Sequence, residues 1–122
     1  IAINAVMDAE RALGFTPVDI SVEKRGYDIE SRDPSGASRL RFIEVKGRID
    51  GADTVTISKN EILTALNQPE QFILGIVRVA NGQAKEIAYV REPFGREPDF
   101  GVTSVNYNLS ELWARGIPPS RI

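Results

Sequence analysis

The chain has 122 residues and a formal net charge of −2, and it contains neither cysteine nor histidine. A chain of this length forms one hydrophobic core, so we expect a single domain over residues 1–122. Without thiols or imidazoles there is no disulfide framework, and any bound metal must take oxygen ligands, as Mg²⁺, Mn²⁺ and Ca²⁺ prefer. The acidic net charge argues against a protein that coats nucleic acid without selectivity.

No apolar run approaches the roughly 20 residues that are needed to span a bilayer, and no signal peptide is visible. We therefore expect a cytoplasmic domain with no membrane-spanning segment. The sequence starts at Ile1 and not at methionine, which predicts an excised part of a longer protein.

The first half of the chain predicts a helix followed by strands. Apolar residues at helical spacing predict an amphipathic helix over residues 2–13, which Gly14 ends. Strands are predicted over residues 17–22, 27–33 and 39–48, with a turn-rich segment between the second and the third. The β-branched residues 54–57 predict a further strand or strand extension.

The second half begins with a capping box. Ser58-Lys59-Asn60-Glu61 has the S-x-x-E pattern and predicts a helix over Lys59–Asn67, which Pro69 ends. The apolar run Phe72–Ala80 predicts a central buried strand, and Asn81-Gly82 predicts a tight turn into an antiparallel strand over residues 84–90. An edge strand over residues 103–109 and a short helix over residues 110–115 follow. This order predicts an α/β domain with a mixed sheet and helices on its faces.

Two carboxylates are predicted to meet on the hairpin that the second and third strands form. If residues 34–38 form a five-residue loop, Asp28 lies directly across from Glu44. Opposed residues on antiparallel strands have Cβ atoms about 4.5–5.5 Å apart, and like charges there repel. Lys46 shares the face of Glu44 because strand side chains alternate. Two carboxylates forced together beside an ammonium group predict a metal site that activates water.

The same register makes predictions for the rest of the hairpin. It pairs Asp33 with Arg39, Ile29 with Ile43, and Tyr27 with Val45. The last two pairs give an apolar face that is suited to packing, whereas Leu40 and Phe42 precede Glu44 on the site face. Burial and a neighbouring carboxylate both raise the pKa of a carboxyl group, and a divalent cation reverses that effect.

Several of these residues also have an ordinary structural explanation. An Asp beside a turn and a Glu-x-Lys on a strand are common as solvated charges or cross-strand ion pairs. Glu30 would lie opposite Phe42 and is interpreted as a surface charge or a partner of Arg32, and the capping box explains Glu61. The aromatic residues Trp113, Tyr107 and Phe100 are interpreted either as packing anchors or as platforms for stacking on bases.

The element order and the three charged residues resemble the PD-(D/E)XK, or restriction-endonuclease-like, nuclease superfamily. Its core is αβββαβ, with an acid on the second strand and a (D/E)-x-K motif on the third. Asp28 matches the first acid, Glu44 the second and Lys46 the lysine. Tyr27 stands where the superfamily pattern has proline, a position at which proline is often missing.

A closer resemblance is to the No-vein-type C-terminal domain family within that superfamily. The matching motifs are Gly26-Tyr27-Asp28-Ile29, Ile43-Glu44-Val45-Lys46-Gly47 and Ser58-Lys59-Asn60-Glu61. The likeness extends over residues 9–14 and 72–79. It implies a restriction-endonuclease-like fold in which a mixed central sheet is flanked by helices, with a C-terminal β-hairpin extension.

The resemblance also implies a function. It predicts a Mg²⁺- or Mn²⁺-dependent nuclease that hydrolyses DNA, with Asp28, Glu44 and Lys46 as the catalytic residues. The metal ligands would be Asp28, Glu44 and the backbone carbonyl of Val45. Superfamily members often carry an acid on the first helix, which makes Glu10 an additional candidate ligand, although a solvated helix charge explains it equally. Such domains often end bacterial helicase-like or defence-associated proteins, so a cis-linked helicase or ATPase is the expected partner.

A non-catalytic nucleic-acid-binding or protein-docking module that retains the nuclease fold is the alternative. It would use the basic residues and would not need the three charged site residues; the basic residues are Lys24, Arg25, Arg39, Arg41 and Arg48. A structural assembly domain, which binds neither metal nor DNA, is a third possibility. Because phosphate affinity comes chiefly from Lys and Arg contacts, the acidic net charge predicts weak DNA binding by the isolated domain.

Overall fold

The computed structural model describes residues 1–35 and 40–121. The elements are α1 (Ala2–Ala12), β1 (Thr16–Asp19), the 3₁₀ turn η1 (Ser21–Glu23), β2 (Ile29–Arg32), β3 (Leu40–Ile49), β4 (Thr54–Ser58), α2 (Lys59–Asn67), β5 (Phe72–Ala80), β6 (Gln83–Arg91), β7 (Ser104–Asn108) and α3 (Leu109–Ala114). This order confirms the predicted helix, three strands, helix, strand and β extension. No helix in the described part of the chain is long and apolar enough to cross a membrane.

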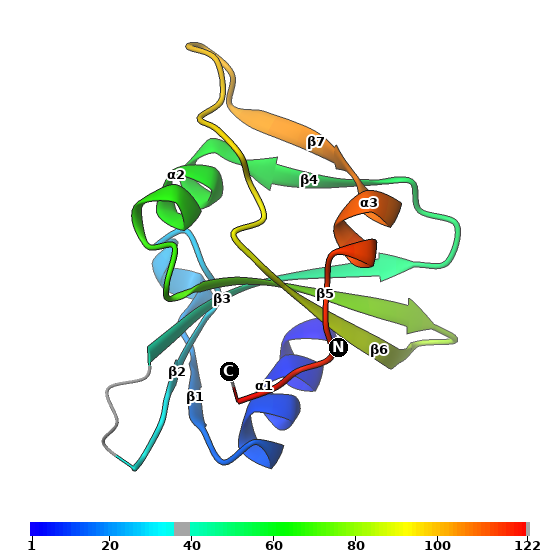
Figure 1. Cartoon of the computed structure of the whole chain (residues 1–122). Coiled ribbons are helices and arrows are strands. Elements are labelled where there is room, and N and C mark those ends of the chain that lie inside the picture. Colours follow the sequence, from blue (N-terminus) through cyan, green and yellow to red (C-terminus); the bar gives the residue numbers. More distant parts are fainter. Residues whose placement is uncertain (36–39, 122) are drawn as a thin grey trace.

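The centre of the fold is a mixed sheet. Its five strands, counted within the described residues, follow the order β1-β2-β3-β5-β6. β3 and β5 run parallel, and every other pair of neighbours is antiparallel. Figure 1 shows α1 on one face of this sheet and α2, β4 and β7 on the other. Because both faces are covered, the central strand β5 is apolar along most of its length, as its sequence predicted.

The strands β4 and β7 form a separate antiparallel pair above the sheet. The predicted edge strand thus joins β4 and not the central sheet. Val55 and Ile57 of β4 are fully buried, and they pack with Ile62 of α2 against the sheet residues Leu74 and Ile76. This pair of strands closes one core and places Ser58 at the entry to α2.

The hairpin of β2 and β3 has the predicted register over its described residues. Ile29 pairs with Ile43, and Glu30 pairs with Phe42. Glu30 also lies 3.7 Å from Arg32, so its interpretation as a surface partner of that arginine holds. Residues 36–39 lie outside the described part of the chain, and with them most of the predicted 34–38 loop and its pairing of Asp33 with Arg39.

The predicted face of Tyr27 is wrong. Ile29 and Ile43 pack against α1, whereas Tyr27 belongs to the core beneath α2 and stacks on Phe42 with ring centroids 4.4 Å apart. The strand β2 begins only at Ile29, and Gly26 has a φ of +90°. The alternation of side chains between faces therefore does not extend back to Tyr27.

Candidate active site

A cavity of about 290 Å³ opens where the segment before β2, the middle of β3 and the first turn of α2 meet. Its lining residues come from three separate stretches of the chain, and among them are Lys24, Asp28, Glu44, Ser58, Asn60 and Glu61. All three motifs that carried the family resemblance therefore contribute to one cavity.

Asp28 is held at the end of the β2–β3 hairpin. Its backbone N–H donates to the carbonyl of Ile43 at 2.9 Å, and its carboxylate Oδ2 accepts the N–H of Val45 at 2.9 Å. The N–H and C=O of one strand residue project to the same side, so the Val45 carbonyl also opens toward Asp28. Asp28, the Val45 carbonyl and the strand that carries Glu44 thus lie together. Asp28 itself precedes Ile29, the first residue of β2.

Gly26 sets how closely the segment before Asp28 approaches α2. A Cβ atom at Gly26 would lie 2.2 Å from Thr64 Oγ1 and 3.2 Å from the Asn60 carbonyl oxygen. Contacts this short require backbone movement, and the φ of +90° is one that side chains disfavour. We expect Gly26→Ala to lower the free energy of unfolding by about 2–4 kcal/mol, as measured by urea denaturation.

Gly82→Ala is the matched control for that change. Gly82 has a φ of +71°, but nothing lies within 4 Å of a Cβ atom built on it. Its substitution carries only the backbone strain, which is about 1 kcal/mol. Equal losses of stability at the two positions would contradict the steric role assigned to Gly26.

Lys46 joins two carboxylates. Its ammonium nitrogen lies 3.2 Å from Glu44 Oε2 and 3.2 Å from Glu61 Oε1. Glu61 is itself fixed by the capping box, because its Oε1 accepts the Ser58 N–H at 2.9 Å and its own N–H donates to Ser58 Oγ at 3.1 Å. The helix cap therefore holds Glu61 as the partner of Lys46. Sequence reasoning assigned Glu61 to the cap alone, and the capping motif within the family resemblance was the signal for this second contact.

Glu44 is the most perturbed acid of the site. Burial raises its pKa, the carboxylates of Asp28 and Glu61 raise it further, and Lys46 offsets only part of this, so the pKa is about 9. Burial alone would lower the pKa of Lys46, but Glu44 and Glu61 outweigh it and raise that pKa. Burial likewise opposes ionisation of Glu61, yet the Ser58 N–H, Glu44 and Lys46 hold its pKa below the ordinary value. At neutral pH the cluster therefore binds a proton at Glu44 when no cation is bound.

The oxygen atoms of Asp28, Glu44 and the Val45 carbonyl fit a hard divalent cation. Mg²⁺ is usually held by one or two carboxylates and completes its octahedron with water. Within residues 1–35 and 40–121, no three acidic side chains converge closely enough to hold a metal by themselves. Two carboxylates and one backbone carbonyl would thus supply the protein's share of the ligands. A cation there would replace the proton that the buried Glu44 otherwise retains.

Glu10 does not join this cavity. It is completely buried on the α1 side of the sheet, where its Oε2 lies 3.2 Å from Arg41 Nη1 and accepts the Tyr89 hydroxyl at 2.8 Å. Arg41 and Glu44 are an odd number of residues apart on β3, so they face opposite sides of the sheet. The expectation of Glu10 as a metal ligand is corrected accordingly, and its interpretation as a solvated helix charge is also wrong.

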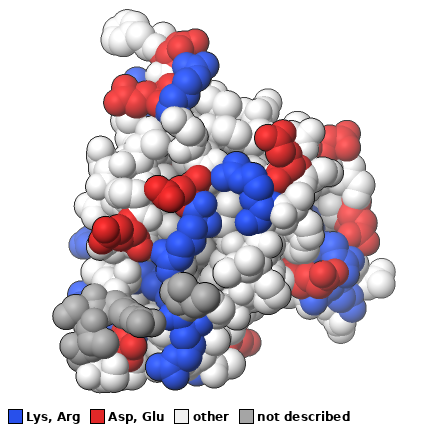
Figure 2. Space-filling view, in the orientation of Figure 1, with Lys and Arg blue, Asp and Glu red and all other residues white. Residues whose placement is uncertain are grey.

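The predicted basic surface is wrong for Arg41. Its side chain is buried, pairs with Glu10 and stacks over the ring of Phe15 at 4.2 Å. Of the other residues assigned to that surface, Arg39 lies outside the described residues, and Arg25 is paired with Glu23 at 2.7 Å. On the face drawn in Figure 2, Lys and Arg side chains run down the middle of the molecule with Asp and Glu beside them. On this face the basic side chains thus form a narrow band that acids flank.

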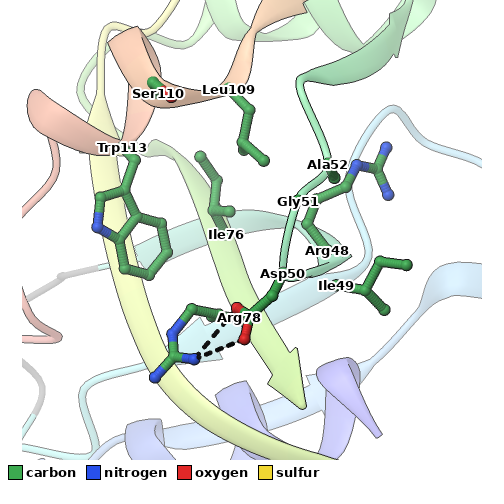
Figure 3. Close-up of a pocket in the computed structure, with 10 residues that line it drawn as sticks. All are labelled: Arg48, Ile49, Asp50, Gly51, Ala52, Ile76, Arg78, Leu109, Ser110 and Trp113. Carbon is green, nitrogen blue, oxygen red and sulfur yellow. Dashed lines mark hydrogen bonds and ion pairs between the residues drawn. The ribbon is translucent and has the colours of Figure 1, made fainter.

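The three aromatic candidates have different surroundings. Tyr107 packs on Phe94, with ring centroids 5.0 Å apart, and is a packing anchor. Trp113 forms a wall of a second cavity of about 260 Å³, where Figure 3 shows its indole beside Ile76 and near the ion pair of Arg78 with Asp50. Phe100 is fully exposed. The second cavity is largely apolar and lies near the end of β3.

The sequence places this domain in a family. A family model described as Protein NO VEIN, C-terminal, matches residues 1–90. The chain belongs to this family. The predicted No-vein-type membership is confirmed, and the match contains Asp28, Glu44, Lys46 and Glu61. The No Vein match ends near the end of β6, so β7 and α3 lie outside it. No curated protein matches the chain.

The fold is similar to that of a solved resolvase. The structure of Archaeoglobus fulgidus Hjc, a Holliday junction resolvase from an archaeal hyperthermophile, matches this No Vein domain with a TM-score of 0.64. The two share 13% sequence identity, and the match covers 94% of each chain. The predicted restriction-endonuclease-like architecture is thereby confirmed at the level of the fold.

Proposed function

We propose that the domain is a Mg²⁺-dependent nuclease that hydrolyses phosphodiester bonds in DNA. The observation that carries this proposal is the buried Glu44, which lines one cavity with Asp28 and Glu61 and forms an ion pair with Lys46. A site that only stabilised the fold would not be expected to bury a carboxyl group beside two others, because burial and repulsion both oppose its ionisation. Strongly perturbed acids in a cavity are typical of catalytic sites.

Each residue has a distinct role in the proposed site. Asp28, Glu44 and the Val45 carbonyl would hold the cation, which would supply a water of lowered pKa and a positive charge for the scissile phosphate. Lys46 orients the attacking water and stabilises charge that develops on the phosphate. Glu61 positions the Lys46 ammonium group through their ion pair. Lys24, which also lines the cavity, is available to contact the substrate phosphate.

The fold supports nucleic acid as the substrate class. The solved relative of similar fold is described as a Holliday junction resolvase, and such an enzyme acts on DNA. In the whole protein we infer a cytoplasmic setting and a cis-linked helicase or ATPase that delivers DNA to this domain, in defence or DNA processing. The net charge of −2 supports dependence on such a partner, since affinity for phosphate comes chiefly from Lys and Arg contacts.

Asp28→Asn tests the proposal directly. The amide oxygen of asparagine can still accept the Val45 N–H, so the fold should be kept while a charged ligand is lost. We expect Mn²⁺ affinity, measured by calorimetry, to fall at least about tenfold, and cleavage of plasmid and single-stranded DNA to be lost. Glu30→Gln is the matched control, because this nearby carboxylate pairs with Arg32 outside the cavity. It should leave both readouts unchanged.

The alternative function makes a different prediction. A docking module that only retained the fold would bind DNA equally with aspartate or asparagine at position 28, and the wild type would cut nothing. Wild-type protein that neither binds Mn²⁺ nor cleaves DNA at low salt would therefore contradict the nuclease proposal.

A further inference from the structure

The connection between β6 and β7 presents an aromatic side chain entirely to solvent. Residues 92–103 rise above β4 and β7 at the top of Figure 1, and the same projection stands clear of the body in Figure 2. Phe100 in this loop has a relative exposure of 101%. Burying a phenylalanine stabilises a protein, so this loop forgoes a contribution to folding.

The loop is ordered by contacts that hold Phe100 outward. At its base, Phe94 is buried and packs against Phe72, with ring centroids 6.3 Å apart. Further along, Arg96 pairs with Asp99 at 3.1 Å, and the N–H of Val102 donates to the Asp99 carbonyl at 3.0 Å. Phe100 therefore lies in a turn that has its own backbone and ion-pair contacts, and its ring faces solvent.

The loop is attached beside the acidic cavity. The carbonyl of Thr103 accepts the N–H of Lys59 at 2.9 Å, and Ser104 pairs with Ser58. Ser58 and Asn60, on either side of Lys59, line the cavity. Three residues of chain span at most about 10 Å, so Phe100 lies within a few nucleotides' length of that rim.

The surroundings of the ring indicate which part of a nucleic acid it contacts. The Lys59 ammonium nitrogen lies 5.9 Å from the centroid of the Phe100 ring, which leaves a cation next to an aromatic face. The segment 93–103 carries two acids and a single arginine, so it is poorly suited to track a phosphate backbone. An aromatic ring beside one cation instead suits a nucleobase with its adjacent phosphate.

We propose that Phe100 stacks on an unpaired base of the substrate while Lys59 contacts the neighbouring phosphate. Base faces inside a duplex are covered by their stacked neighbours, so an unpaired base is available to the ring only in a single strand, a splayed end or a branch point. This assigns the substrate class as DNA with unpaired bases next to the cleaved bond. The inference rests on the proposed nuclease function, and its loop lies beyond the residues matched by the family model.

The experiment measures binding in an inactive Lys46→Ala background, so that no substrate is consumed. Fluorescence anisotropy at low salt compares three labelled DNAs: a single strand, a splayed duplex and a blunt duplex. We expect Phe100→Ala to weaken binding of the first two roughly tenfold and to leave the blunt duplex unchanged. Phe100→Trp should restore the affinity. Ile49→Ala removes another exposed apolar side chain and serves as the matched control.

Parallel cleavage assays with Lys46 intact separate the two proposals. If the wild type cuts DNA but Phe100→Ala binds all three DNAs as before, only the stacking proposal is overturned. If the protein neither binds nor cuts any DNA, the nuclease proposal fails and the stacking proposal fails with it. Sedimentation gives one further outcome: loss of self-association in Phe100→Ala would show that the ring contacts a second copy of the chain, which overturns stacking on a base.

Discussion

Replacing Lys46 with alanine is expected to lower the rate of DNA cleavage by roughly 10²–10³-fold, the range typical of removing one group that stabilises charge in the transition state. The Lys46 ammonium nitrogen lies 3.2 Å from a carboxylate oxygen of Glu44 and 3.2 Å from one of Glu61. Among the described residues, Lys46 is the cation that pairs with both carboxylates. Its loss removes the group that orients the water and stabilises the charge on the phosphate. Plasmid nicking and single-strand cleavage at low salt, with Mg²⁺ or Mn²⁺, give the rate.

Two further variants make this result specific. Lys46→Arg keeps a positive charge between the carboxylates but places it in a bulkier group with a much higher pKa, so it should retain folding and restore little activity. Lys85→Ala removes an exposed lysine that bonds Gln83 on β6, and it should cleave like the wild type. Near-wild-type cleavage by Lys46→Ala would remove Lys46 from the catalytic set, whatever its effect on stability.

Glu44→Gln is expected to stabilise the metal-free protein at pH 8 while abolishing cleavage. The pKa of Glu44 is raised from 4.5 to about 9 on folding, so the folded state binds a proton more tightly than the unfolded state. That contribution to stability is complete below the unfolded pKa and is lost as the pH rises toward the folded pKa. The wild type should therefore lose stability between about pH 4.5 and about pH 9, whereas the uncharged amide should not.

The same linkage gives the expected difference in the free energy of unfolding between Glu44→Gln and the wild type. One pKa unit corresponds to about 1.4 kcal/mol, so the ceiling at pH 8 is about 5 kcal/mol, and relaxation of the cluster should reduce it to about 2–3 kcal/mol. Urea denaturation in EDTA at pH 5 and pH 8 measures it, and the gain should nearly vanish at pH 5. Glu86→Gln, at an exposed ion pair with Arg78, is the control and should change stability little.

Addition of Mn²⁺ supplies the complementary result. The cation should stabilise the wild type at pH 8 more than Glu44→Gln, because only the carboxylate gains by exchanging its proton for the metal. A variant that is less stable than the wild type at pH 8 in EDTA would contradict the assigned burial and repulsion at Glu44.

The sequence alone predicted the elements whose signals are local. The helix Lys59–Asn67 has its predicted bounds because a capping box starts it, and the strand Phe72–Ala80 because an uninterrupted apolar run defines it. The turn at Asn81-Gly82 has positive φ at both residues, as a tight hairpin requires. The predicted grouping of Glu44 with Lys46 rests likewise on alternation within one regular strand.

Only the tertiary structure decided the features that depend on residues far apart in the chain. The contact of Lys46 with Glu61 exists because α2 begins over β3, and no local pattern records that approach. Glu10 and Arg41 read as surface charges in the sequence, yet each is buried because the other neutralises it from 31 residues away. Charge by itself does not determine exposure, since a paired and hydrogen-bonded ion can leave water whereas a single one cannot. The sequence thus determined the fold and the three charged candidates, and tertiary packing decided which further charges surround them.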